Sequence, residues 1–69
     1  MESSAIEIGK KLRTARRAKD ISQADLAKQV GINITSYARI ERGEVNVTLD
    51  NFLKVLKVLN MSIDDIISQ

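Results

Sequence analysis

The segment over residues 22–43 restricts the fold of this chain more than any other part of it. Its sequence is SQADLAKQVGINITSYARIERG, in which apolar residues recur at helical spacing over about 23–30 and again over about 34–42. Only residues 31–33 separate the two patterns. A connection of that length is too short for antiparallel helices and is typical of helices set at a steep angle. We therefore predict a helix-turn-helix motif whose second helix presents the functional surface.

Residues that cap helices stand at the expected places around both patterns. Ser22 and Asn33 precede the two helices and can accept hydrogen bonds from their free N–H groups. Gly31 and Gly43 follow them and can adopt the positive φ that ends a helix. The caps and the apolar spacing thus predict the same helix boundaries.

Three further helices are predicted around this motif, over about 5–18, 49–59 and 63–68. Ser3 or Ser4, then Thr48, and then Ser62 with Asp65 can cap their starts. The apolar residues expected to face the core are Ile8, Leu12, Ala15, Leu26, Ala27, Val30, Tyr37, Ile40, Leu49, Phe52, Leu53, Leu56 and Leu59. The predicted fold class is all-α, a compact five-helix domain over residues 1–69.

Three residues predict local backbone features. Gly9 weakens a helix interior by about 1 kcal/mol relative to Ala, so its presence indicates close packing near the N-terminal turn of the first helix. Asp20 and Asn60 stand where the chain must leave a helix, and both are expected in the left-handed conformation.

The composition excludes several classes of function. The 69 residues include no Cys and no His, which removes disulfide frameworks, Cys/His zinc sites, thiol nucleophiles and the Ser-His-Asp triad. We therefore expect no catalysis, no metal and no cofactor. No apolar run approaches the roughly 20 residues of a membrane span, and residues 1–5 lack the pattern of a secretory signal. A soluble, cytoplasmic chain without membrane contact is expected.

Charge is distributed unevenly along the chain. The net charge is only +2, but six basic residues crowd positions 10–19, whereas Asp64 and Asp65 lie near the C-terminus with no basic residue after Lys57. Such asymmetry favours binding of a polyanion at one pole. The alternative is an ordinary solvated basic face on a helix.

Several residue blocks give the chain a close resemblance to a known family. They are Ile8-Gly9-Lys10-Lys11-Leu12-Arg13 with Arg16, Ile21-Ser22-Gln23-Ala24-Asp25-Leu26-Ala27, Val30-Gly31-Ile32, and Arg39-Ile40-Glu41-Arg42-Gly43. In these blocks, and from Thr48 through Ser62, the chain resembles the Cro/C1-type helix-turn-helix regulators, also called the xenobiotic response element family. The resemblance covers about residues 6–67 without a gap. It implies a lambda-repressor-like fold and a role in transcription regulation.

The resemblance also implies how the chain meets double-stranded DNA. In such proteins the second motif helix enters the major groove while the first lies over the backbone. The implied base contacts are Asn33, Ile34, Thr35, Ala38 and Arg39. The implied phosphate contacts are Gln23, Ser36, Arg42, Asn46, Thr48, Arg13 and Arg17. The alternative for Ile34 and Thr35 is surface filling, and for any single Lys it is a solvated charge.

Among the base contacts, Arg39 is the best candidate for specific reading. Its guanidinium can donate two hydrogen bonds to guanine, which discriminates by about 1 to 3 kcal/mol.

Arg16 and Glu41 match a pair that in similar phage repressors joins the first helix to the end of the recognition helix. We expect a partly buried ion pair between them. The alternative is two independent surface charges, which contribute little to stability.

A symmetric homodimer is expected through the last two helices. Bulky residues stand there where the family often has small ones, and they supply more apolar surface than a 69-residue monomer readily covers. The expected interface residues are Val55, Leu56, Val58, Met61 and Ile67. The alternative is a larger core within the monomer.

The sequence therefore predicts a sequence-specific regulator of the Cro/C1 type, most simply a repressor that binds a palindromic operator. It leaves open a stand-alone repressor, an antitoxin and a restriction-modification controller, with a toxin or RNA polymerase as possible protein partner. We expect no small-molecule effector, because no ligand-sensing segment follows the last helix. Two other classes stay open: a protein-interaction adaptor that uses the Ile34, Thr35 and Tyr37 region, and a small hydrolase without a recognisable catalytic constellation.

Overall fold

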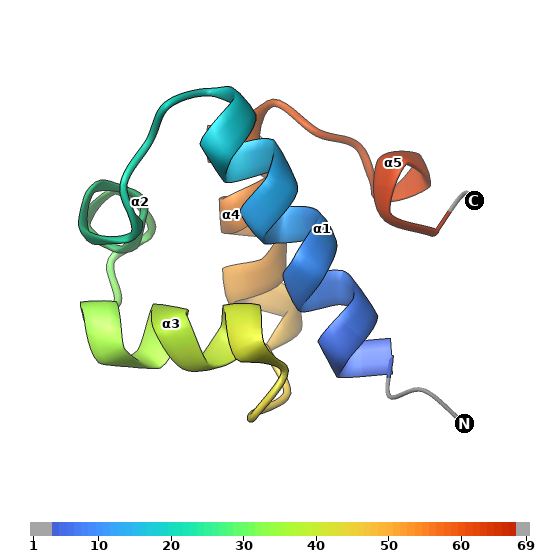
Figure 1. Cartoon of the computed structure of the whole chain (residues 1–69), viewed down its shortest axis with the longest axis horizontal. Helices are drawn as coiled ribbons and strands as arrows, with labels where there is room; N and C mark the ends of the chain where they lie inside the picture. Colours follow the sequence, from blue (N-terminus) through green and yellow to red (C-terminus); the bar gives the residue numbers. More distant parts are fainter. Residues whose placement is uncertain (1–3, 68–69) are drawn as a thin grey trace.

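The computed structural model describes residues 4–67 and contains five α-helices over that range, with no strand (Figure 1). They are α1 (Ser4–Ala18), α2 (Gln23–Val30), α3 (Ile34–Arg42), α4 (Leu49–Leu59) and α5 (Ile63–Ile67). The all-α prediction is confirmed, and the bounds of α2, α3 and α4 are those expected. Ser4 lies inside α1 and does not cap it, while Ser3 and the predicted end of the last helix at position 68 fall outside the described residues.

The predicted caps form at four helix starts. Ser22 Oγ accepts from the Asp25 N–H at 3.0 Å, Asn33 Oδ1 from Ser36 at 2.7 Å, and Thr48 Oγ1 from Asn51 at 3.2 Å. At α5 the Ser62 N–H donates to Asp65 Oδ2 at 2.9 Å, and Ser62 Oγ accepts from the Asp65 N–H at 3.4 Å. The caps satisfy N–H groups that have no partner within their helices.

The predicted helix ends also have the expected backbone. Gly31 and Gly43 adopt φ of 93° and 74°, and Asp20 and Asn60 adopt φ of 62° and 57°. Each of these residues therefore reverses the chain locally after a helix, in the left-handed region that Asp and Asn tolerate better than most residues.

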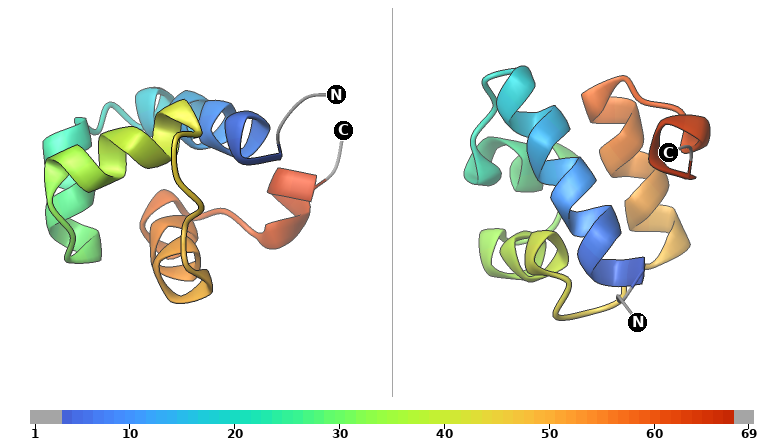
Figure 2. Two further views of the ribbon diagram at one scale, coloured as in Figure 1. Left: turned by 90° about the horizontal axis from the view of Figure 1, so that it is seen from below. Right: turned by 45° about the vertical axis from the view of Figure 1, so that its right-hand side comes forward.

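The helices surround one small core. α3 packs against α1 and α2, and α2 packs against α4. Figures 1 and 2 show α2 and α3 crossing at one side of the molecule, while α5 lies on the side away from them. The buried apolar residues are Leu12, Leu26, Ala27, Val30, Tyr37, Ile40, Val55, Leu56, Leu59 and Ile66.

The predicted inner face of α4 is wrong in part. Val55 and Leu56 are 0% and 4% exposed, whereas Leu49 and Leu53 are 69% and 45% exposed. The apolar stripe of α4 is wider than the surface that its neighbours cover, and Val55 fills the core from a position that the Leu spacing did not indicate. Val55 and Leu56 are thus core residues of the single chain, and their assignment to a dimer interface is incorrect.

Gly9 permits a close approach between α1 and the end of α3. A Cβ atom built at this residue would lie 2.6 Å from the Ile40 carbonyl oxygen and would also overlap the carbonyl of Glu41. Both obstacles are backbone atoms, which cannot move aside as a flexible side chain can. The close packing predicted from this glycine is confirmed.

We predict that Gly9→Ala destabilises the chain although Ala favours a helix. The overlap with α3 should cost more than the propensity gain of about 1 kcal/mol, giving a net loss of about 1 to 3 kcal/mol. Urea unfolding measures the change, and Lys10→Ala, an exposed site in the same helix, serves as the control. A Gly9→Ala variant more stable than the parent would contradict this packing.

Candidate nucleic-acid interface

Helix α3 has an inner and an outer face of different character. Tyr37, Ile40 and Glu41 are buried, at 0%, 7% and 4% exposure. Ile34, Thr35, Ser36 and Arg39 are exposed, and Ala38 is half-buried. The predicted base contacts therefore share a solvent-facing surface of one helix, together with its cap Asn33.

A buried ion pair holds α3 against α1. Arg16 Nε donates to Glu41 Oε2 at 2.6 Å and Arg16 Nη2 donates to Glu41 Oε1 at 3.3 Å. The two side chains are 9% and 2% exposed. Arg16 Nη1 also donates to the Ile21 carbonyl at 2.7 Å, which ties the start of the motif to the same guanidinium. The ion pair predicted between these residues is present, and it is buried.

Glu41 stays ionised in this setting. Burial by itself would raise the pKa of the Glu41 carboxyl, but hydrogen bonds from Arg16 and Gln23, the charge of Arg16 and the neighbouring Tyr37 hydroxyl together lower that pKa below its ordinary value of 4.5. Burial raises the pKa of Tyr37. The Tyr37 hydroxyl is buried without a hydrogen-bond partner of good geometry among residues 4–67.

Gln23 is joined to this ion pair. Its Nε2 donates to Glu41 Oε1 at 3.0 Å, a contact that the sequence did not indicate. Gln23 is the first residue of α2, where free N–H groups and the helix dipole favour an anion. The same carboxylate therefore orients both the end of α3 and the side chain at the start of α2.

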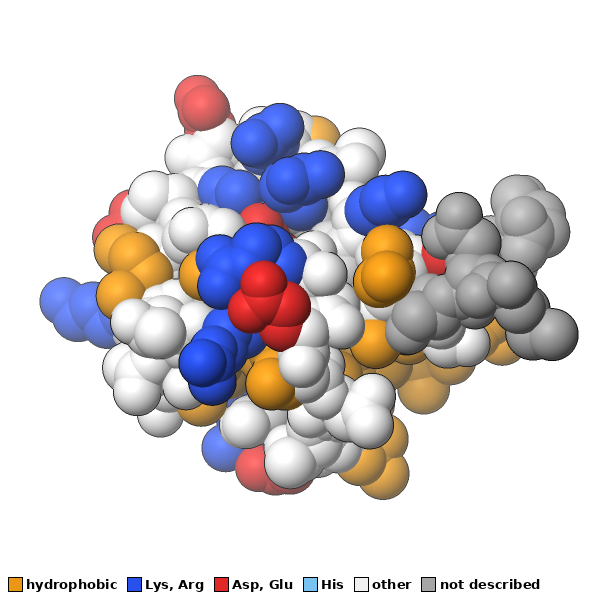
Figure 3. Space-filling model, turned by 60° about the horizontal axis from the view of Figure 1, so that its bottom comes forward, with side chains coloured by type: hydrophobic (Ala, Val, Ile, Leu, Met, Phe, Trp, Pro, Cys, Tyr) orange, Lys and Arg blue, Asp and Glu red, His pale blue; other side chains and the backbone are white. Residues whose placement is uncertain are grey.

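The other predicted phosphate contacts lie at helix starts or on α1. Ser36, Thr48, Arg13 and Arg17 are exposed. Arg17 borders a hollow of about 310 Å³ that Ser22 also lines, so it lies near the start of α2. On the face that α3 contributes, Lys and Arg side chains gather in a group, with acidic side-chain atoms against them (Figure 3).

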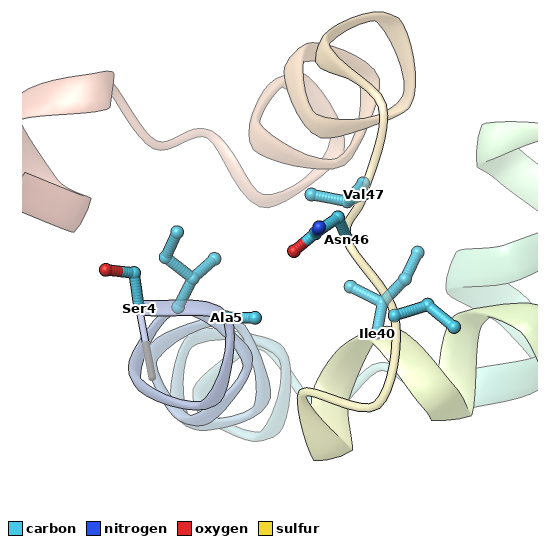
Figure 4. Close-up of a pocket in the computed structure, with 7 residues that line it drawn as sticks. Ser4, Ala5, Ile40, Asn46 and Val47 are labelled. Carbon is cyan, nitrogen blue, oxygen red and sulfur yellow. The ribbon is translucent and has the colours of Figure 1, made fainter. Parts of the chain in front are cut away.

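Asn46 has a different setting from the other predicted phosphate contacts. It is exposed but lines a pocket of about 270 Å³ between the start of α1, the end of α3 and the connector before α4. Figure 4 shows Ser4 and Ala5 of α1 facing Asn46 and Val47 across this pocket, with Ile40 of α3 beside it. Its side chain is thus placed among largely apolar neighbours.

Arg42 has an acidic partner that sequence reasoning missed. Arg42 Nε and Nη2 donate to the two carboxylate oxygens of Glu44 at 2.8 and 3.1 Å. Hydrogen bonding to Glu44 raises the pKa of Arg42, and hydrogen bonding to Arg42 lowers the pKa of Glu44. The signal in the sequence was the order Arg42-Gly43-Glu44, in which a left-handed glycine can fold the acid back onto the base.

Within residues 4–67, no helix has the length and apolar character needed to cross a membrane. No group of three or more Asp and Glu side chains in that range lies close enough together to hold a metal ion.

A family model for the helix-turn-helix matches residues 12–66, which include the whole of α2 and α3. The chain belongs to the helix-turn-helix family of Cro/C1-type transcription regulators. The match confirms the predicted family and, with it, the predicted class of DNA-binding transcription regulators.

Two relatives show what kinds of regulator the chain is similar to. The cryptic phage CTXphi transcriptional repressor RstR of Vibrio cholerae is 36% identical over 61 residues, which make up 88% of this chain and 54% of the repressor. The chain thus spans about half the length of that protein. The control protein C.MunI of a Mycoplasma species is 35% identical over 69 residues, covering 99% of this chain and 93% of that protein.

Two solved structures share the fold. The restriction-modification controller protein C.AhdI of Aeromonas hydrophila superposes with a TM-score of 0.85 at 34% identity, over 90% of this chain and 94% of that one. The P22 c2 repressor, solved in complex with a synthetic operator, superposes with a TM-score of 0.80 at 31% identity, over 88% and 92% of the two chains.

We predict that the contribution of the Arg16–Glu41 pair to stability depends on pH. Because the pKa of Glu41 is lowered by folding, its contribution is present above pH 4.5 and is lost as the pH falls through the lowered value. Near neutral pH, Arg16→Met or Glu41→Gln alone should cost about 3 to 5 kcal/mol, since each leaves a buried group without its partner. Urea unfolding at pH 7 and in the acid range measures both effects.

The double variant tests whether the two residues act as a pair. Its loss should be smaller than the sum of the single losses by about 1 to 3 kcal/mol. Additive losses, or single variants as stable as the parent at pH 7, would contradict the coupling.

Proposed function

We propose that this chain represses transcription by binding a palindromic operator as a homodimer, with α3 inserted in the major groove of each half-site. The observation that carries the proposal is the difference between the two faces of α3. Its inner face is buried against the core, and its outer face exposes polar, apolar and basic residues. A helix in the major groove needs such an outer face to meet base edges. The P22 c2 repressor, similar in fold, is a protein solved with operator DNA.

The proposed readers and phosphate contacts divide the surface between them. Arg39 is exposed near the middle of α3 and supplies two donors for a guanine. Ile34 and Thr35 supply methyl groups for contact with thymine, and Asn33 retains its amide N–H groups because only its Oδ1 is used by the cap. The proposed contacts to phosphate, which position the protein without reading sequence, are Gln23, Ser36, Arg42, Asn46, Thr48, Arg13 and Arg17.

The proposed dimer uses apolar residues that the single chain leaves exposed. Leu49 and Leu53 are one helical turn apart on α4, and Ile63 and Ile67 are one turn apart on α5, at exposures between 45% and 69%. Ile67 belongs to the interface predicted from the sequence, and Leu49, Leu53 and Ile63 take the place of Val55 and Leu56. Val58 and Met61 are half-buried against the core. Two α3 helices related by a two-fold axis would then lie about 34 Å apart on one face of the duplex.

A restriction-modification controller is the second candidate. The observation that favours it is similarity to two control proteins, C.MunI at 35% identity and C.AhdI at 34% identity. The DNA-binding surface proposed above is the same for either role.

Selection of bound sites from random duplex DNA tests the proposal. The parent chain should select a palindrome whose half-sites are one helical turn apart. Arg39→Ala should relax one position in each half-site with a loss of about 1 to 3 kcal/mol, because only its base contact is removed. Lys57→Ala, which removes a charge from the exposed side of α4, is the control. Failure of the parent to select any sequence would favour the protein-interaction adaptor.

Sedimentation of two matched variants tests the dimer. Leu53→Lys should dissociate it, because a charge would be buried at the proposed interface. Ile34→Lys is the control, since Ile34 is 47% exposed and Leu53 is 45% exposed, but Ile34 lies on the DNA face. A parent chain that is monomeric both free and on operator DNA, or equal effects of the two variants, would overturn the proposed interface.

A further inference from the structure

One of the arginines proposed to bind DNA phosphate is already hydrogen-bonded to a carboxylate of the same chain. Arg42 and Glu44 form a two-pronged pair through Nε and Nη2, at 2.8 and 3.1 Å, although both side chains are about half exposed. This edge of a guanidinium is the one that also binds a phosphate with two hydrogen bonds. Glu44 therefore presents to Arg42 the geometry that a phosphate group would present.

The turn at the end of α3 holds Glu44 in this position. Gly43 is left-handed, and the Glu44 N–H donates to the Arg39 carbonyl at 3.0 Å. A Cβ atom at Gly43 would lie 2.6 Å from Ile6 Cα, so the turn is also packed against α1. Two hydrogen-bonded prongs and a packed turn distinguish this pair from two long side chains that meet in solvent.

Glu44 also lies in the field of the proposed base reader. Hydrogen bonding to Arg42, together with the charges of Arg42 and Arg39, lowers the pKa of the Glu44 carboxyl. Figure 3 shows acidic side-chain atoms directly against basic ones in the middle of the face that α3 contributes.

We propose that Glu44 is a built-in competitor of DNA phosphate, which occupies Arg42 in the free protein and is displaced when the protein binds a duplex. This inference rests on the proposed function. Because phosphate contacts carry no sequence information, the competition lowers affinity for every duplex and leaves the preferred sequence unchanged. Stable binding then depends more on the base contacts of Arg39 and its neighbours.

The test is a double-substitution cycle read by fluorescence anisotropy with a labelled duplex of the selected operator at low salt. Glu44→Gln keeps the size of the side chain and removes its charge. It should tighten binding about two- to fivefold, the range set by the weak net strength of an exposed pair. In an Arg42→Gln background the same change should have little effect. Asp25→Asn, which removes a charge near the start of α2, should give the same result in both backgrounds.

Each other outcome decides against the proposal. Weaker binding by Glu44→Gln would show that Glu44 positions Arg42 for DNA, and unchanged binding would show that the pair has no role. An equal gain with and without Arg42 would indicate a general effect of charge. If the parent binds DNA and its binding weakens with salt, any of these results overturns the competitor role but not the proposed function. A parent that binds no duplex overturns the proposed function as well. Thermal unfolding of each variant verifies that the fold is retained.

Discussion

An ionised carboxylate that is 2% exposed needs partners, and in this chain the hydrogen-bond partners of Glu41 come from two other helices. Arg16 approaches it from α1, Gln23 from the start of α2, and Arg16 in turn binds the carbonyl of Ile21 before the motif. Gly9 lets the backbones of α1 and α3 meet beside this pair. The orientation of α3, and with it the direction of its outer face, depends on these contacts, because losing one partner leaves the other charge buried.

In the proposed complex, the outer side of α3 offers few side-chain groups for contact with bases. Ala38 contributes a half-buried methyl group, and Asn33 has one side-chain oxygen engaged in its cap. Among residues 4–67, Arg39 has no acidic hydrogen-bond partner, whereas Arg42 is paired with Glu44. Specificity in the proposed complex therefore depends mainly on Arg39, whereas contacts to the DNA backbone are shared among α1, α2 and the helix caps.

Local signals in the sequence were sufficient for most of the fold. The caps Ser22, Asn33 and Thr48 and the left-handed Gly31 and Asn60 depend only on neighbouring residues, and they set the helix bounds correctly. The covered side of α4 could not be read in the same way, because its apolar stripe is wider than the surface that α2 covers. Val55 is buried and Leu49 is exposed as a result of packing between elements far apart in sequence. The pairing of Glu44 with Arg42 likewise depends on side-chain directions after a left-handed turn. The hydrogen bond from Gln23 to Glu41 depends on how α2 packs against α3.

The proposed function requires that the outer face of α3 is the surface that contacts DNA. NMR titration of isotopically labelled protein with its selected duplex tests it most directly, residue by residue. We expect the largest changes in amide shift at Ile34, Thr35, Arg39 and Gln23, with little change in α5. Changes concentrated on α5, with α3 unaffected at saturating DNA, would contradict it.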